Sequence, residues 1–138
     1  MTTMTALQWP ALSAVSGKRL LIVDDNAASR EAVKDLAGAK ASVGCVVADD
    51  GVRALSALCE ALARGESLEA AVIDAGMPNF DGIALGRAIK SDPALAGMGL
   101  ILMVSLARPA DADSARAAGF SAVVTKPVRE ADLMRALL

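Results

Sequence analysis

The chain has 138 residues, 54% of them hydrophobic, and a formal net charge of −2. This length and apolar content suit one folded domain with its own core and exclude an intrinsically disordered chain. The charge balance leaves no basic stripe, so we expect no direct binding of nucleic acid. No apolar run reaches membrane-spanning length and no signal peptide is evident, so we expect a cytoplasmic protein without a membrane segment in this chain.

Two residue types limit the chemistry further. The sequence contains no histidine, which excludes a Ser-His-Asp triad and removes the commonest general base. Cys45 and Cys59 are not spaced as a metal-binding motif. We therefore expect reduced thiols in the core.

The pattern of elements begins after an irregular segment. Residues 1–18 lack a regular period, which predicts a linker or tail ahead of a domain over residues 19–138. In that domain, short apolar runs alternate with segments of helical spacing. The predicted strands cover residues 19–23, 42–48, 70–74, 100–104 and 122–124, and the predicted helices cover residues 27–37, the segment between Gly51 and Gly65, and residues 82–90, 112–118 and 129–138.

Five strand–helix repeats predict an α/β fold with right-handed crossovers, a parallel sheet and helices on both faces. The common doubly wound strand order for five strands is 2-1-3-4-5, as in flavodoxin-like folds. In that order the first and third strands end at one crevice. Asp24 and Asp25 follow the first strand, and Asp74 ends the third.

The three aspartates predict a cation site at this edge. Carboxylates that converge without an arginine repel one another unless a cation joins them, and Mg²⁺ prefers oxygen ligands of this kind. The pair Asp24–Asp25 has a simpler alternative role in capping the next helix, although a cap needs only one acid. Lys126 follows the fifth strand at the same edge, where it suits a phosphate or carboxylate better than a surface role.

These residues closely resemble the receiver domain of two-component signalling. The matching segments are residues 21–26, 48–51, 74–82 and 125–128, and the resemblance extends over residues 19–138. It implies a phosphorelay receiver that accepts a phosphoryl group on Asp74 from a histidine kinase or a histidine phosphotransfer protein. Such a domain is a signalling module and not an enzyme, although a parent hybrid protein could be a histidine kinase.

The resemblance also implies the roles of the surrounding residues. Asp25, Asp74 and the carbonyl of Gly76 would bind Mg²⁺ directly, and Asp24 would act largely through water. Lys126 would pair with the phosphoryl oxygens.

Two positions depart from the family pattern. The fourth strand of receivers usually ends in a Thr or Ser that contacts the phosphoryl group, and counting back from Gly119 and Lys126 places Val104 there. A shift of one residue would give the role to Ser105, but we favour Val104. The aromatic residue expected three positions before the lysine is Val123. Both changes predict a weak or unconventional conformational response to phosphorylation.

Several expectations concern the wider context. Receivers attached to hybrid sensor kinases have segments most like residues 16–20 and 125–129. Because the sequence also stops at Leu138, we expect an excised or terminal receiver. The initial Met1 leaves a stand-alone protein as an alternative. We also consider a homodimer through the face of the fourth helix, fifth strand and fifth helix. The main alternative function is a pseudo-receiver that binds a protein or ligand without phosphorylation. A Mg²⁺-dependent phosphatase is disfavoured because its acids are usually spaced Asp-x-Asp.

Overall fold

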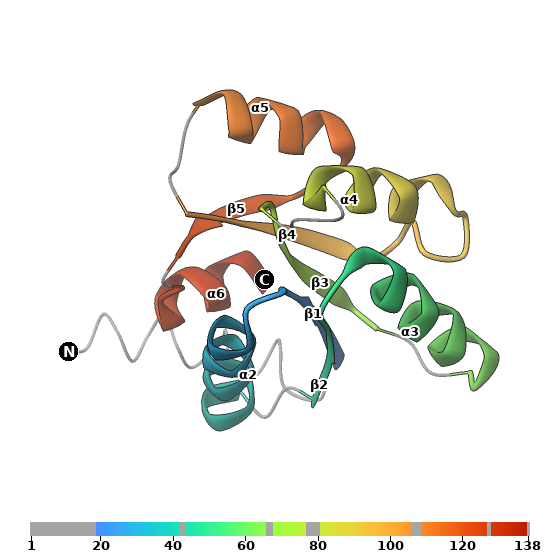
Figure 1. The fold of residues 1–138 in the computed structure, drawn as a ribbon, viewed down its shortest axis with the longest axis horizontal. Helices are drawn as coiled ribbons and strands as arrows, with labels where there is room; N and C mark the ends of the chain where they lie inside the picture. Colours follow the sequence, from blue (N-terminus) through green and yellow to red (C-terminus); the bar gives the residue numbers. More distant parts are fainter. Residues whose placement is uncertain are drawn as a thin grey trace.

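The computed structural model describes residues 19–41, 44–65, 68–76, 81–105, 109–126 and 128–137. The predicted linker or tail over residues 1–18 lies outside this part of the chain. The strands are β1 (Arg19–Val23), β2 (Gly44–Ala48), β3 (Ala70–Asp74), β4 (Gly99–Val104) and β5 (Ala122–Thr125) (Figure 1). The helices are α2 (Ala27–Ala41), α3 (Gly51–Ala63), α4 (Gly82–Ser91), α5 (Pro109–Ala118) and α6 (Glu130–Leu137).

The strands form one parallel sheet in the order β2-β1-β3-β4-β5. This confirms the predicted doubly wound α/β fold. Val23 at the end of β1 pairs with Ile73 near the end of β3, so these two strands reach the same edge of the sheet together. The order changes direction between them, which is where open α/β sheets place their ligands.

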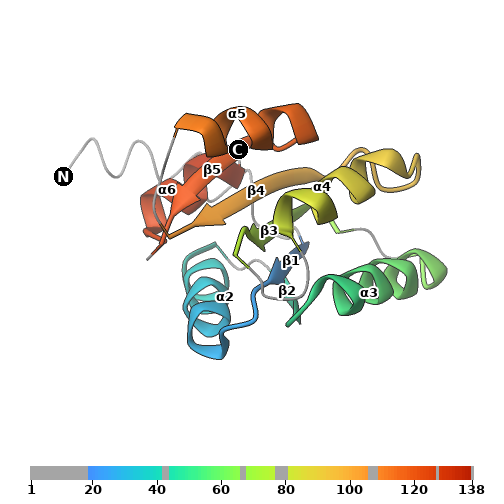
Figure 2. The same cartoon turned by 45° about the horizontal axis from the view of Figure 1, so that its top comes forward.

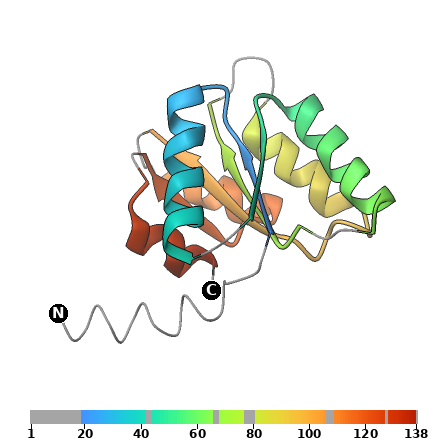
Figure 3. The same ribbon diagram turned by 90° about the horizontal axis from the view of Figure 1, so that it is seen from below.

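Helices cover both faces of the sheet. Figure 3 shows α2 and α6 on one side and α3 and α4 on the other, and Figure 2 shows α5 beside α4. Successive strand residues alternate between the two layers because their side chains point to opposite faces. In β4, Leu100, Leu102 and Val104 pack in the cluster with α3, α4 and α5, whereas Ile101 and Met103 pack in the cluster with α2 and α6.

Side-chain caps start three of the helices. The Asn26 side chain accepts a hydrogen bond from the backbone N–H of Ser29 at 3.0 Å and so caps α2. Asp50 accepts from the Arg53 amide at 2.8 Å at the start of α3. Asp81 accepts from the Ile83 amide at 2.9 Å at the start of α4.

Some predicted boundaries and core positions were wrong. Helix α2 continues through Gly38 to Ala41, because one glycine costs a helix only about 1 kcal/mol and packing outweighs it. Helix α5 begins at Pro109 and not at residue 112, since proline is well tolerated in the first turn. Cys59 on α3 is exposed and not in the core.

Among the described residues, no helix is both long and apolar enough to cross a membrane.

Candidate functional site

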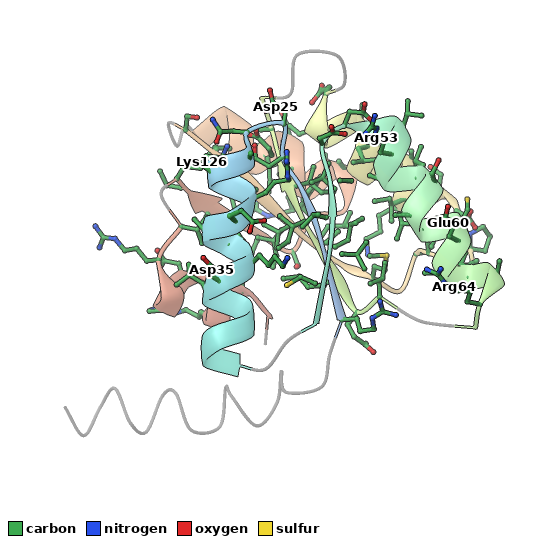
Figure 4. All side chains as sticks on the ribbon, turned by 60° about the horizontal axis from the view of Figure 1, so that its bottom comes forward. Asp25, Asp35, Arg53, Glu60, Arg64 and Lys126 are labelled. Carbon is green, nitrogen blue, oxygen red and sulfur yellow. The ribbon has the colours of Figure 1, made fainter. Side chains whose placement is uncertain are left out.

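The three predicted aspartates meet at the edge where β1 and β3 end. Asp24 directly follows β1 and Asp74 is the last residue of β3. Each of Asp24, Asp25 and Asp74 offers a carboxylate oxygen, and these oxygens lie within 4.8 Å of one another. Asp24 is completely buried and Asp74 is 5% exposed, whereas Asp25 lies open to solvent. Figure 4 shows Asp25 and Lys126 at the end of the molecule where α2 begins.

Lys126 neutralises part of this charge. Its Nζ lies 3.0 Å from Asp24 Oδ2 and 3.2 Å from Asp74 Oδ2. The side chain is only 20% exposed, so both ion pairs are largely shielded from water. The amide of Lys126 also donates to the Val104 carbonyl at 2.8 Å, which ties the end of β5 to the end of β4. The structure therefore brings together the acids and the lysine that the sequence predicted at this edge.

The pKa values of two of these groups, Asp24 and Lys126, differ from their ordinary values. Burial raises the pKa of Asp24 above its ordinary value, and the neighbouring Asp74 carboxylate adds to the rise, although the Asn26 amide and Lys126 oppose it. Burial by itself would lower the pKa of Lys126. The hydrogen bonds and attraction from Asp24 and Asp74 outweigh this effect, so the pKa of Lys126 is raised. The ammonium group therefore stays charged at neutral pH.

Asp24 is held by its own backbone neighbours. Its amide donates to the Ala48 carbonyl at 3.1 Å. Its Oδ1 accepts a hydrogen bond from the backbone N–H of Asn26 at 2.9 Å. Its carbonyl oxygen accepts from the Arg30 guanidinium at 2.8 Å. These contacts leave Oδ2 as the oxygen that faces Lys126.

Asp74 is held by the turn that follows it. The Gly76 amide donates to Asp74 Oδ1 at 3.1 Å. Helix α4 begins directly behind this residue: a Cβ added to Gly82 would lie only 2.2 Å from the Asp74 carbonyl oxygen. A glycine is therefore required where α4 approaches the backbone of the candidate phosphoacceptor.

The end of β4 bears on the hydroxyl position. The side chain of Val104 lies in the cluster with α3, α4 and α5. Asp74 lies two residues after Val72, and Lys126 lies two residues after Val124. Both valines pack in the opposite cluster with α2 and α6. The alternation of β4, continued one residue past its end at Val104, would place Ser105 on the same side as Asp74 and Lys126.

Val123 lies on the other side of the sheet from the acids. It is half-buried and packs against the cluster formed with α3, α4 and α5. This position of β5 lacks the aromatic side chain that the family pattern predicts there.

The donor set fits a hard divalent cation. Three carboxylates lie within 4.8 Å of one another and the Lys126 ammonium group pairs with two of them, so ionised acids leave an excess of negative charge at the site. All the candidate ligands are oxygen atoms, as Mg²⁺ requires. Among the described residues, none forms a hydrogen bond or ion pair with the exposed Asp25 carboxylate, so this group is available to a cation.

Three contributors were missed by sequence reasoning. The predicted site did not include the Asn26 amide, Arg30 or the contact of Gly82 with Asp74. The residue types at Asn26 and Gly82 are weak indications of these contacts, since asparagine is favoured at helix caps and glycine where two backbone segments approach closely. Nothing in the sequence pattern singles out Arg30, because its role depends on how the helix folds back against the loop.

Comparison with known proteins identifies the family. A family model described as response regulator receiver domain matches residues 20–138. The chemotaxis protein CheY of Pseudomonas aeruginosa is 30% identical over 109 residues, which make up 79% of this chain and 84% of that protein.

Solved structures share the fold. A response regulator from Chloroflexus aurantiacus J-10-fl is similar with a TM-score of 0.77 and 20% identity, over 87% of this chain and 97% of that chain. The signal receiver domain of a signal transduction histidine kinase from Syntrophus aciditrophicus is similar with a TM-score of 0.74 and 25% identity, over 88% and 87%. The chain therefore belongs to the response regulator receiver domain family, the signalling modules of two-component systems.

Proposed function

We propose that this receiver accepts a phosphoryl group on Asp74 from a phosphohistidine of a histidine kinase or a phosphotransfer protein. The observation that carries the proposal is the grouping of three carboxylates with Lys126, whose Nζ lies 3.0 Å from Asp24 and 3.2 Å from Asp74. Perturbed titratable groups gathered at one sheet edge mark functional sites.

The reaction uses Asp74 as the nucleophile. A carboxylate oxygen of Asp74 attacks the phosphorus, and the bond from phosphorus to the imidazole nitrogen breaks, with its electron pair remaining on that nitrogen. The phosphoryl group brings about −1.5 to −2 charges to the site. Lys126 already lies within ion-pair distance of Asp74, so its ammonium group can pair with the incoming oxygens without moving far.

The same residues would hold Mg²⁺. Asp25, Asp74 and the Gly76 carbonyl are the proposed direct ligands, with Asp24 acting through water. When bound, the ion supplies positive charge that offsets the charge on the phosphoryl oxygens. The open position of Asp25 supports its role as a direct ligand.

We assign the hydroxyl position to Ser105, which revises the preference for Val104 drawn from counting along the sequence. The packing of Val104 away from the acids supports this assignment. We expect Ser105→Ala to slow phosphorylation roughly 10- to 150-fold, since hydrogen bonds to charged groups contribute about 1.5–3 kcal/mol. Val104→Thr should instead leave the rate close to that of the wild type, and the opposite pattern would return the role to position 104.

The conformational response is expected to be weak or unconventional. With Ser105 at the site, this expectation rests on Val123, because a half-buried valine cannot exchange between buried and exposed positions as a large ring can. A switch requires the phosphoryl charge to favour one of two packings. A chemical-shift map with beryllofluoride, a phosphoryl mimic, that shows strong changes along residues 110–138 would contradict this expectation.

Several wider expectations remain proposals. Attachment to a hybrid sensor kinase is supported by the similarity to a receiver from a histidine kinase of Syntrophus aciditrophicus. For a homodimer, the predicted face corresponds to α5, β5 and α6. It contains the free edge of β5 and a groove of about 300 Å³ lined by residues 122–125, Asp132, Arg135 and Ala136. Sedimentation with and without beryllofluoride tests this dimer.

The decisive experiment is phosphorylation by acetyl phosphate with Mg²⁺, followed by intact mass. We expect the wild type to gain one phosphoryl group and Asp74→Asn to gain none. Asp81→Asn is the matched control, because Asp81 is an exposed acid that caps α4 and an asparagine can keep that cap. A wild type that gains no phosphoryl group and binds no beryllofluoride, while a control receiver does, would favour the pseudo-receiver alternative.

A further inference from the structure

Two of the three site acids lie in a very short connection. Only three residues, from Asp24 to Asn26, separate the end of β1 from the start of α2. Asp24 faces Lys126, whereas Asp25 is exposed to solvent and has a carboxylate oxygen within 4.8 Å of those of Asp24 and Asp74. The direction of the Asp25 carboxylate therefore depends on how the backbone of this connection is held.

Arg30 holds that backbone from the second turn of α2. Its amide donates to the Asn26 carbonyl within the helix at 3.0 Å, and its guanidinium folds back to donate to the Asp24 carbonyl at 2.8 Å. Asp24 is completely buried, so water does not reach this carbonyl oxygen. A buried carbonyl needs a partner, and Arg30 provides it.

The bonded carbonyl belongs to the peptide plane that joins Asp24 to Asp25. A peptide unit is planar, so a donor that fixes the Asp24 carbonyl also fixes the amide of Asp25 and the starting direction of its chain. We infer that Arg30 is a positioning residue for the receiver site: it orients the Asp24–Asp25 peptide and thereby aims the Asp25 carboxylate at the cation. The inference rests on the proposed Mg²⁺ site.

The choice of acceptor separates this role from charge neutralisation. Lys126 pairs with carboxylate oxygens, whereas Arg30 donates to a backbone oxygen and leaves the carboxylates free. If Arg30 acted only as a nearby positive charge, its removal would strengthen the binding of a cation. If it positions the loop, its removal weakens that binding, so the two roles predict opposite signs.

The test is titration calorimetry of the full chain with Mg²⁺. We expect Arg30→Ala to weaken Mg²⁺ binding roughly 10- to 100-fold, as is typical when a group that orients a metal ligand is removed. Lys34→Ala is the matched control, because it removes an exposed positive charge one turn further along α2. That variant should bind Mg²⁺ as the wild type does or slightly more tightly.

A second variant and a metal-free readout keep the test decisive. Arg30→Lys keeps the charge but not the guanidinium fork, so we expect an affinity between those of Arg30→Ala and the wild type. In metal-free protein, Arg30→Ala should also speed hydrogen exchange at the Asn26 amide, which donates to Asp24 Oδ1. Unchanged or tighter Mg²⁺ binding by folded Arg30→Ala would overturn the inference. If the wild type binds no Mg²⁺, the proposed metal site is refuted. In that case, hydrogen exchange at the backbone amide of Asn26 that is the same in Arg30→Ala as in the wild type would overturn the positioning role as well.

Discussion

Replacing Lys126 by methionine tests how the charges of the site are balanced. The substitution keeps an unbranched apolar stem but removes the ammonium group that lies 3.0 Å from Asp24 and 3.2 Å from Asp74. Their side chains are 0% and 8% exposed, so both carboxylates lose a partner in a buried place. Removing one member of a buried ion pair costs roughly 3–5 kcal/mol. The partial exposure of Lys126 places the expected loss near the lower end, at about 3 kcal/mol.

The loss should depend on pH. Burial raises the pKa of Asp24 above its ordinary value of 3.8, so this group binds protons more readily in the folded state. Its contribution to the stability of the protein therefore falls as the pH rises from 3.8 through the raised pKa. Lys126→Met removes a contact that lowers this pKa, so the fall becomes larger in the variant. The difference in stability between wild type and variant should therefore shrink as the pH is lowered from 7 towards 4.

Urea unfolding followed by far-ultraviolet circular dichroism measures this difference. We also expect Mg²⁺ to stabilise the variant more than the wild type, because a bound ligand stabilises the folded state and the variant has more uncompensated charge. Arg53→Met is the control: its pair with Asp49 is 3.4 Å long and its side chain is 72% exposed, so its stability should change by less than about 1 kcal/mol. A stability difference for Lys126→Met that stays constant between pH 7 and pH 4, or grows on acidification, would refute this account of the site.

Three further predictions concern stability. Gly82→Ala would place a Cβ 2.2 Å from the Asp74 carbonyl, so we expect a loss of about 1–3 kcal/mol in urea unfolding, whereas Gly97→Ala enters open space and should change it by less than about 0.5 kcal/mol; equal losses would contradict the steric argument. Leu58 is 2% exposed and Leu62 is 43% exposed, so Leu58→Ala should cost about 2–5 kcal/mol and Leu62→Ala clearly less, and the reverse order of unfolding midpoints would show that α3 packs differently. The ion pairs of Lys126 stabilise the protein below its ordinary pKa of 10.5 and are lost as pH rises through the raised folded pKa, so thermal melts above about pH 10.5 should show a steeper loss in wild type than in Lys126→Met; parallel curves would argue against it.

Much of the fold could be predicted from the sequence because its signals are local. Short apolar runs bounded by turn residues predicted β1 over residues 19–23, as observed. The strand–helix alternation then left few topologies, since parallel strands require right-handed crossovers. That topology was sufficient to bring Asp24, Asp25 and Asp74 to one edge, and the structure places them there.

Element boundaries and core positions were less certain because tertiary packing decides them. Gly38 is a common stop signal, yet α2 runs past it. In α3, the helical spacing of Ala54, Leu55, Leu58 and Leu62 predicts that all four form the inner face. The structure instead buries Ala61 and leaves Leu62 exposed. One position along a helix turns the side chain by about 100°, so a small error in the assumed face exchanges two neighbours.

Periodicity and topology can be read from the sequence, so they predicted the fold class and brought the three aspartates and Lys126 to one edge of the sheet. The choice between Val104 and Ser105 at the end of β4 depends instead on tertiary packing. Counting along the chain leaves this choice open, since one residue more or less in a loop shifts the register, whereas the packing of Val104 in the cluster with α3, α4 and α5 supports the proposed role of Ser105. The contact of Arg30 with the Asp24 carbonyl also appears only in three dimensions, because it joins a helix to a loop through a side chain that bends back.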